Sequence, residues 1–107
     1  MFSRLIPLWA KSNKQKYSSV KTLIGVFFGP DYDIFGQDIN EIMINYTSTV
    51  NDASRAILRD QLNALLDIQD DAELDSIMSE LAENQFRPEP WGETWRSYLS
   101  KIKNYLV

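Results

Sequence analysis

The chain of 107 residues contains no cysteine and no histidine. Without cysteine it has no disulfide framework and no thiolate metal site, which fits a reducing compartment. Without histidine it lacks the side chain used most often for general acid–base catalysis. Aspartate, glutamate, lysine, tyrosine and serine remain, but none stands in a recognised catalytic spacing. The composition therefore favours a binding protein over an enzyme.

Long hydrophobic runs are also missing. The longest apolar stretch, residues 23–28, contains Gly25 and falls well short of the roughly 20 residues that span a bilayer. Residues 5–9 are too short for the core of a signal peptide, and lysines follow them. We therefore expect a cytoplasmic protein without membrane contact. Its length suits one domain with one hydrophobic core.

Charge is distributed very unevenly along the chain. All 15 acidic residues lie within residues 31–93, where Arg55, Arg59 and Arg87 alone oppose them. The first thirty residues contain cations but no acid, and residues 22–100 contain no lysine. Ordinary solvated surfaces mix both signs of charge. The acidic centre therefore predicts a surface that binds a positively charged partner, and it would repel nucleic acid directly.

Hydrophobic periodicity predicts an all-α fold of about five helices in a compact orthogonal or bundle-like array. Residues 1–17 are expected to form a basic flexible lead, in which residues 11–16 act as a connector. Residues 18–107 are expected to form a single helical domain. Its first helix begins at the capping residues Ser18 and Ser19 and ends before Gly29 and Pro30.

Four further segments follow from capping signals and apolar spacing. Asp38 starts a helix that residues 47–51 close, and Asn51 or Asp52 starts the longest one. The apolar stripe expected on that longest helix consists of Ile57, Leu58, Leu62, Leu65 and Leu66. Asp70 opens the next helix, which ends at Asn84 in a left-handed conformation. Prolines hold residues 86–92 as an extended linker, and Thr94 caps the last helix, in which Trp95 packs in the core beside Leu99.

The main candidate binding residues are acidic and lie around the start of the fourth helix. They are Asp67, Asp70, Asp71, Asp75, Glu80 and Glu83. Acids in the first turn of a helix stabilise it against the macrodipole by about 0.3–1 kcal/mol each, which accounts for Asp70 and Asp71. It does not account for Asp67, which follows the negative end of the preceding helix. Solubility and partner binding remain open as explanations for this group.

A second set of candidates comes from two loops. Asp31 and Asp33 form a D-x-D pair, which can hold a divalent cation when a substrate phosphate shares it. A plain turn after Gly29 and Pro30 is the favoured interpretation of this pair. Tyr32 and Trp91 lie in loops, and tyrosine and tryptophan are favoured anchors at interfaces.

The residues from Ile24 to Asp33, Ile-Gly-Val-Phe-Phe-Gly-Pro-Asp-Tyr-Asp, are followed by Gly36 and the capped helix from Asp38 to Tyr46. A Leu-rich helix, a second acidic helix, a proline-containing linker and a final tryptophan-bearing helix come next. In this order the chain resembles the immunity proteins of bacterial contact-dependent growth inhibition over residues 18–106. In place of the family's usual His or Gln after the Phe-Phe pair, this chain has Gly29 and Pro30.

The resemblance implies a cytoplasmic helical protein that is not an enzyme and needs no cofactor or metal. It would bind the C-terminal toxin domain of its cognate effector in a 1:1 complex and would be a monomer when free. Toxins of these systems are often nucleases, frequently acting on transfer RNA. An acidic inhibitor would suit the basic site of a nuclease. Two alternatives remain open: an adaptor for a basic protein or peptide, and a metal-dependent enzyme using Asp31 and Asp33.

Overall fold

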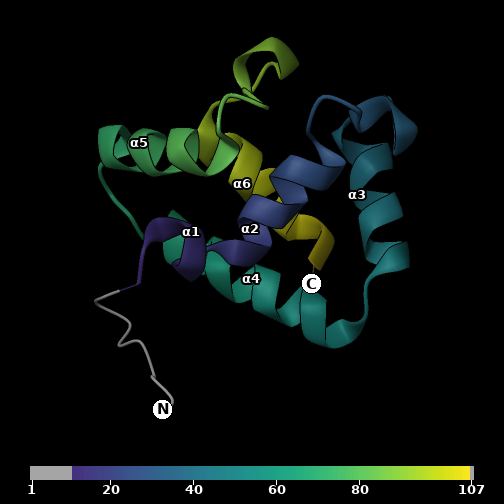
Figure 1. The fold of residues 1–107 in the computed structure, drawn as a ribbon, viewed down its shortest axis with the longest axis horizontal. Coiled ribbons are helices and arrows are strands. Elements are labelled where there is room, and N and C mark those ends of the chain that lie inside the picture. The colour runs from purple at the N-terminus through teal and green to yellow at the C-terminus, as the bar shows by residue number, and fades with distance from the viewer. Residues whose placement is uncertain (1–10, 107) are drawn as a thin grey trace, which may run out of the picture.

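The computed structural model describes residues 11–106, and within them the chain is helical without a strand (Figure 1). The α-helices are α1 Asn13–Lys16, α2 Ser18–Thr22, α3 Ile39–Thr49, α4 Asp52–Leu66, α5 Asp71–Ala82 and α6 Trp95–Lys103. A π-helical segment, Leu23–Phe27, continues α2, and short 3-10 turns occupy Tyr32–Ile34, Glu89–Trp91 and Asn104–Leu106. The all-α class expected from the sequence is confirmed. No helix of the described part has the length and hydrophobicity to cross a bilayer.

The helix formed by α2 and its π continuation crosses the middle of the molecule, with α3 and α5 on opposite sides of it (Figure 1). Its first backbone N–H groups are satisfied from another helix. The side chain of Gln61 in α4 accepts hydrogen bonds from the Ser19 and Val20 amides at 2.9 and 3.2 Å. The prediction that Ser18 and Ser19 cap this helix is therefore wrong. Tyr17 occupies the N-cap position, and its side chain makes no capping hydrogen bond.

One hydrophobic core joins all the longer helices. Leu58, Leu62 and Leu65 of α4 are fully buried, as their spacing predicts. Ile57 is 51% exposed, so its assignment to the core stripe was wrong. Consecutive helical residues point about 100° apart, and this places Ile57 beyond the edge of the buried face. Trp95 and Leu99 are both buried, as expected.

The caps of the later helices agree with the sequence signals. The side chains of Asp38, Asn51, Asp70 and Thr94 accept hydrogen bonds from the Glu41, Ser54, Ala72 and Ser97 amides, respectively. Asn84 is left-handed at φ 65°, and Glu83 before it is also left-handed at φ 50°. Local capping rules thus fixed where these helices begin and where α5 ends.

The connector expected at residues 11–16 is a helix instead. Ser12 and Gln15 form a reciprocal capping box at the start of α1. The side chain of Asn13 donates to Glu80 at 3.1 Å, and Lys14 lies 2.7 Å from Glu83, so α1 is held against α5. Residues 1–10, which make up most of the lead expected over residues 1–17, lie outside the described part.

The linker expected to be extended over residues 86–92 is partly turned. Its first residue, Phe86, is only 5% exposed. The amide of Trp91 donates to the Pro88 carbonyl at 2.9 Å, which closes the 3-10 turn Glu89–Trp91. Burial of Phe86 thus holds the start of the linker against the core, and the 3-10 turn follows it.

The neighbours Leu58 and Ile57 give a direct test of the α4 orientation. We expect Leu58→Ala to lower the free energy of unfolding by about 2–5 kcal/mol, because it leaves a cavity in the core. Ile57→Ala should change it by about 0.5 kcal/mol or less, since the side chain is half exposed. Urea denaturation followed by circular dichroism measures both. Similar losses for the two variants would show that α4 is rotated relative to the structure.

Candidate functional site

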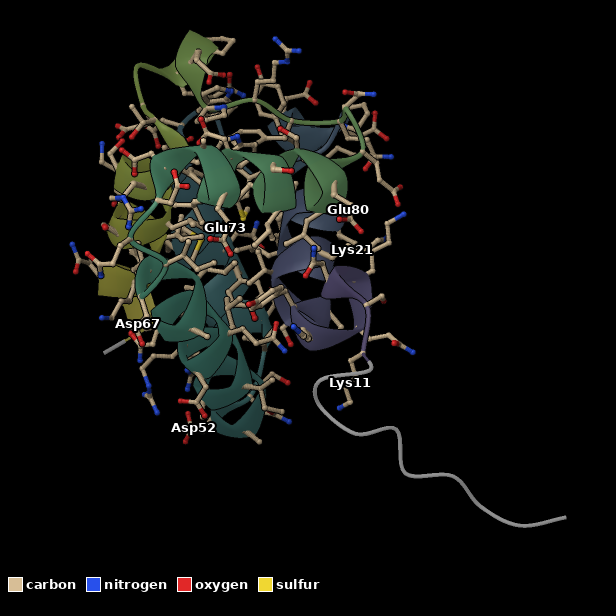
Figure 2. All side chains as sticks on the ribbon, turned by 90° about the vertical axis from the view of Figure 1, so that its left-hand side faces the viewer. Lys11, Lys21, Asp52, Asp67, Glu73 and Glu80 are labelled. Atoms are coloured by element: carbon tan, nitrogen blue, oxygen red, sulfur yellow. The ribbon has the colours of Figure 1, made fainter. Side chains whose placement is uncertain are left out.

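The candidate carboxylates of α5 lie on two flanks of the helix. Asp71 and Asp75 face α6 and line a small recess with Arg96 and Thr94. Glu80 and Glu83 face α1, where they contact Asn13 and Lys14. Figure 2 shows Glu73 and Glu80 of α5 on the same face of the molecule as Lys21 of α2. The structure thus divides the predicted acidic cluster into two groups.

The carboxylate of Glu83 is partly neutralised by the chain's own lysines. Lys14 Nζ lies 2.7 Å from it, and Lys21 Nζ lies 3.9 Å away. The hydrogen bond from Lys14 lowers the pKa of Glu83, and the charges of Lys14 and Lys21 lower it further. The same contact raises the pKa of Lys14. Glu83 therefore serves first to dock α1 and α2 on α5.

The Asp71 carboxylate pairs with an arginine of α6. Arg96 of α6 donates from Nε to the Asp71 carboxylate at 2.7 Å. Its terminal nitrogens donate to the backbone carbonyls of Ile68 at 2.7 Å and Leu66 at 3.3 Å. One guanidinium therefore holds the last turn of α4, the connection to α5 and the first turn of α5 together. This makes Asp71 part of the fold's framework.

Four exposed carboxylates around the start of α5 make no ion pair within residues 11–106: Asp67, Asp70, Glu73 and Asp75. Three of them, Asp67, Asp70 and Asp75, are candidates from the sequence. Asp67 ends α4, and in Figure 2 it lies at the edge of the molecule. Asp70 caps α5 through the Ala72 amide at 2.9 Å, which leaves its charge facing solvent. These three residues carry most of the unpaired negative charge around the start of α5.

The loop candidates Tyr32 and Trp91 are brought together by the fold. Their ring centroids are 5.0 Å apart, in an edge-on arrangement. Trp91 also lies 5.7 Å from Phe86, which anchors the linker in the core. Both residues are half-buried, and Asp31 and Asp33 beside them are exposed. The loops at 31–35 and 89–91, far apart in sequence, therefore form one aromatic surface with acidic neighbours.

The turn interpretation of the D-x-D pair is confirmed. The Tyr32 amide donates to the Gly29 carbonyl at 3.0 Å, and the Ile34 amide donates to the Asp31 carbonyl at 3.1 Å. No group of three potential metal ligands occurs among the described residues.

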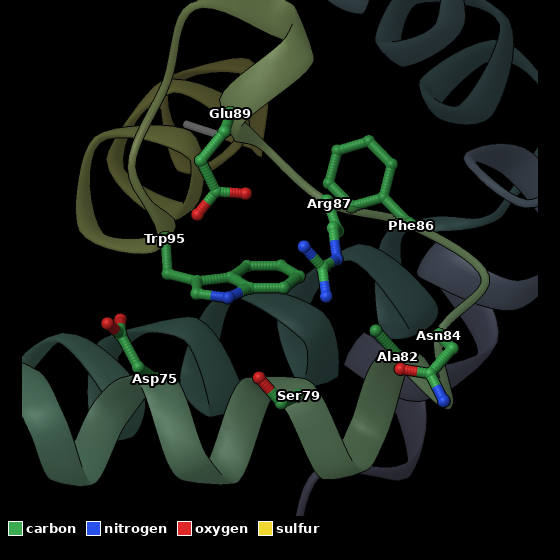
Figure 3. A pocket seen from close by; sticks show the side chains of 8 residues that line it. All are labelled: Asp75, Ser79, Ala82, Asn84, Phe86, Arg87, Glu89 and Trp95. Carbon is green, nitrogen blue, oxygen red and sulfur yellow. The ribbon is translucent and has the colours of Figure 1, made fainter.

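A cavity of about 220 Å³ lies between α5, the linker and the start of α6 (Figure 3). It is lined by Asp75, Ser79, Ala82, Asn84, Phe86, Arg87, Glu89 and Trp95. Of these, the sequence pointed only to Asp75 as a site residue. For the other lining residues the sequence offers one indication. Phe86 is an apolar residue among prolines and charged residues, which indicates that the linker is anchored in the core.

The family profile described as CdiI immunity protein matches residues 16–106. The chain belongs to this family. The match covers every helix from α2 to α6, in agreement with the resemblance found over residues 18–106. Neither the curated proteins nor the solved structures gave a match. Family membership implies that this immunity protein is an inhibitor of a toxin and not an enzyme.

The role of Arg96 can be tested by stability. We expect Arg96→Gln to lower the free energy of unfolding by about 1–3 kcal/mol, because two backbone carbonyls and Asp71 lose charge-assisted hydrogen bonds. Arg96→Lys should not restore the loss, since an ammonium cannot match the planar fork of the guanidinium. Urea denaturation measures both variants. Full stability of Arg96→Gln would contradict this role.

The Glu83–Lys14 contact predicts a pH-dependent docking of α1. A carboxyl group with a lowered pKa in the folded state stabilises that state above its ordinary pKa, which is 4.5 for glutamate. The contribution is lost as the pH falls through the lowered pKa. We therefore expect the amide protection factors of residues 16 and 17 to fall on acidification from pH 6 to pH 3.

In the Glu83→Gln variant the same protection factors should already be low at pH 6 and should change little with pH. Hydrogen exchange read by NMR measures them. An acid-induced fall of equal size in the variant would assign the effect to another carboxylate.

Proposed function

We propose that this chain binds the C-terminal toxin domain of a contact-dependent growth inhibition effector in a 1:1 complex and thereby neutralises it in the cytoplasm. Family membership supports the inhibitory role. The observation that supports the binding mode is the charge of Asp67, Asp70 and Asp75, which are exposed and make no ion pair with any cation of residues 11–106.

The chemistry of the proposed partner follows from this charge. A nuclease domain, for example one that cleaves transfer RNA, carries a basic site because it binds phosphate groups. A carboxylate surface can occupy such a site or cover its rim. Complementary charge can raise association rate constants towards about 10⁸–10⁹ M⁻¹s⁻¹ at low salt. Fast capture protects a cell from its own toxin.

The proposed contact surface has an acidic part and an aromatic part. Asp67, Asp70 and Asp75 supply the field that steers association. Tyr32 and Trp91, with Asp31 and Asp33 beside them, supply rigid half-buried anchors of the kind that dominate binding energy. Asp71, Glu80 and Glu83 contribute negative potential, although their side chains are engaged within the protein. We propose that the free protein is a monomer.

Charge reversal tests the steering role. We expect Asp67→Lys combined with Asp75→Lys to slow association with the toxin domain encoded next to the immunity gene by about tenfold or more at low salt. The difference should shrink as salt is raised, because screening weakens long-range attraction. Stopped-flow fluorescence measures the rates. These two positions avoid the cap at Asp70 and the ion pair at Asp71.

The control with the same change in net charge reverses two carboxylates of α4, Asp52→Lys with Asp60→Lys. Because Asp52 pairs with Arg55, circular dichroism checks that this variant is folded. Figure 2 places Asp52 at the end of α4 farthest from α5. An equal slowing by this control would show that net charge alone matters and would remove the proposed surface. Binding of the wild-type protein without protection of cells would favour the adaptor alternative.

A further inference from the structure

The cavity between α5 and the linker lies between the two parts of the proposed contact surface. Asp75 of the acidic part lines it directly. On the other side, a series of ring contacts leads from Trp95 to Phe86, Trp91 and Tyr32, with centroids 5.8, 5.7 and 5.0 Å apart. A partner that covers both parts therefore passes over this cavity.

The indole of Trp95 forms one wall of the cavity. Trp95 is only 5% exposed, and in Figure 3 its ring nitrogen lies on the edge turned toward Ser79. The structure contains no hydrogen bond from this N–H to any group of residues 11–106. Among the described residues, Tyr98 Oη is the only fully enclosed side-chain polar atom without a partner. The Trp95 nitrogen therefore keeps access to the cavity, where it can donate to an oxygen atom from outside the chain.

Two carboxylates face the same space from different elements. Asp75 projects from α5 and Glu89 from the linker, and both line the cavity that the Trp95 ring borders (Figure 3). Neither makes an ion pair within the described residues. The only cation of the lining is Arg87, which is exposed and has no carboxylate partner there either. The charged side chains of the lining thus sum to one negative charge.

We propose that this cavity receives one arginine side chain of the toxin domain. Its guanidinium is held between Asp75 and Glu89, and a carbonyl of the same toxin segment accepts from the Trp95 indole. The planar guanidinium has five N–H donors and can serve two carboxylates at once, which the compact ammonium of lysine does less well. The inference rests on the proposed function, because it names a contact of that same interface.

The size of the cavity fits a single side chain. Sites for cofactors and drug-sized ligands measure about 300–1,000 Å³, whereas this cavity measures about 220 Å³. Its walls come from a helix and from a linker anchored by Phe86, so it is formed before the partner arrives. Preformed pockets that bury an arginine are typical of interface hot spots.

Substitution of Arg87 tests the sign of the charge on the bound ligand group. It places a positive charge beside the Trp95 indole, where the incoming guanidinium would lie. We therefore expect Arg87→Gln to tighten binding of the toxin domain about threefold or more, because a like charge is removed. A ligand group of negative charge would lose its partner in this variant and bind more weakly.

The experiment measures the Kd of the adjacent-gene toxin domain, in a catalytically inactive form, by calorimetry. Asp75→Asn combined with Glu89→Gln should weaken binding about thirtyfold, as expected for a hot spot. Trp95→Phe, which keeps an aromatic ring but removes the five-membered ring with its N–H, should weaken it about five- to tenfold. The matched control, Asp52→Asn with Asp60→Asn, should change Kd less than threefold.

Each result bears on a different statement. Unchanged binding by the Asp75/Glu89 variant overturns the arginine pocket and leaves the proposed function standing, since the wild-type protein still binds. Weaker binding by Arg87→Gln overturns it in favour of an anionic ligand group. Absence of binding by the wild-type protein overturns both proposals. If Trp95→Phe fails to fold, the three exposed residues Asp75, Arg87 and Glu89 still decide the question.

Discussion

The burial of the Phe86 ring is the contact on which the functional end of the molecule depends. Phe86 lies within 4.8–5.8 Å of the rings of Phe28, Trp91, Trp95 and Tyr98. Such ring pairs contribute about 0.5–1.5 kcal/mol each beyond the area they bury. Because this ring anchors the linker, the linker is fixed over the start of α6 and along α5. The cavity, the Trp91–Tyr32 pair and the position of Glu89 all follow from it.

A second constraint is electrostatic. The carboxylates of the acidic centre repel one another. In the fold, cationic side chains that precede and follow this centre in the sequence lie beside some of these carboxylates. Lys14 and Lys21 approach Glu83, Arg96 pairs with Asp71, and Lys101 lies 2.6 Å from Glu93. Exposed ion pairs of this kind add little stability individually. Within residues 11–106 they leave Asp67, Asp70 and Asp75 among the exposed carboxylates without an ion pair.

Agreement between sequence and structure was best where the physical cause is local. Capping bonds at Asp38, Asn51, Asp70 and Thr94 join residues two or three positions apart, so they could be read directly. The predictions were wrong where contacts with another helix determine the local structure. Residues 13–16 have no apolar residue of their own, and α1 is held by contacts to α5 some 67 residues away. The start of α2 is satisfied by Gln61, which no local rule predicts.

The sequence by itself determined the all-α class, the starts of the later helices, the end of α5 and the negative sign of the central surface. These properties depend on hydrophobic period, on hydrogen bonds within a single turn and on composition. Tertiary structure alone decided which carboxylates remain unpaired, that Tyr32 meets Trp91, and that Asp75, Glu89 and Trp95 share one cavity. The reason is that ion pairs and cavity walls join residues many positions apart, and only the packing of helices on one core sets their distances.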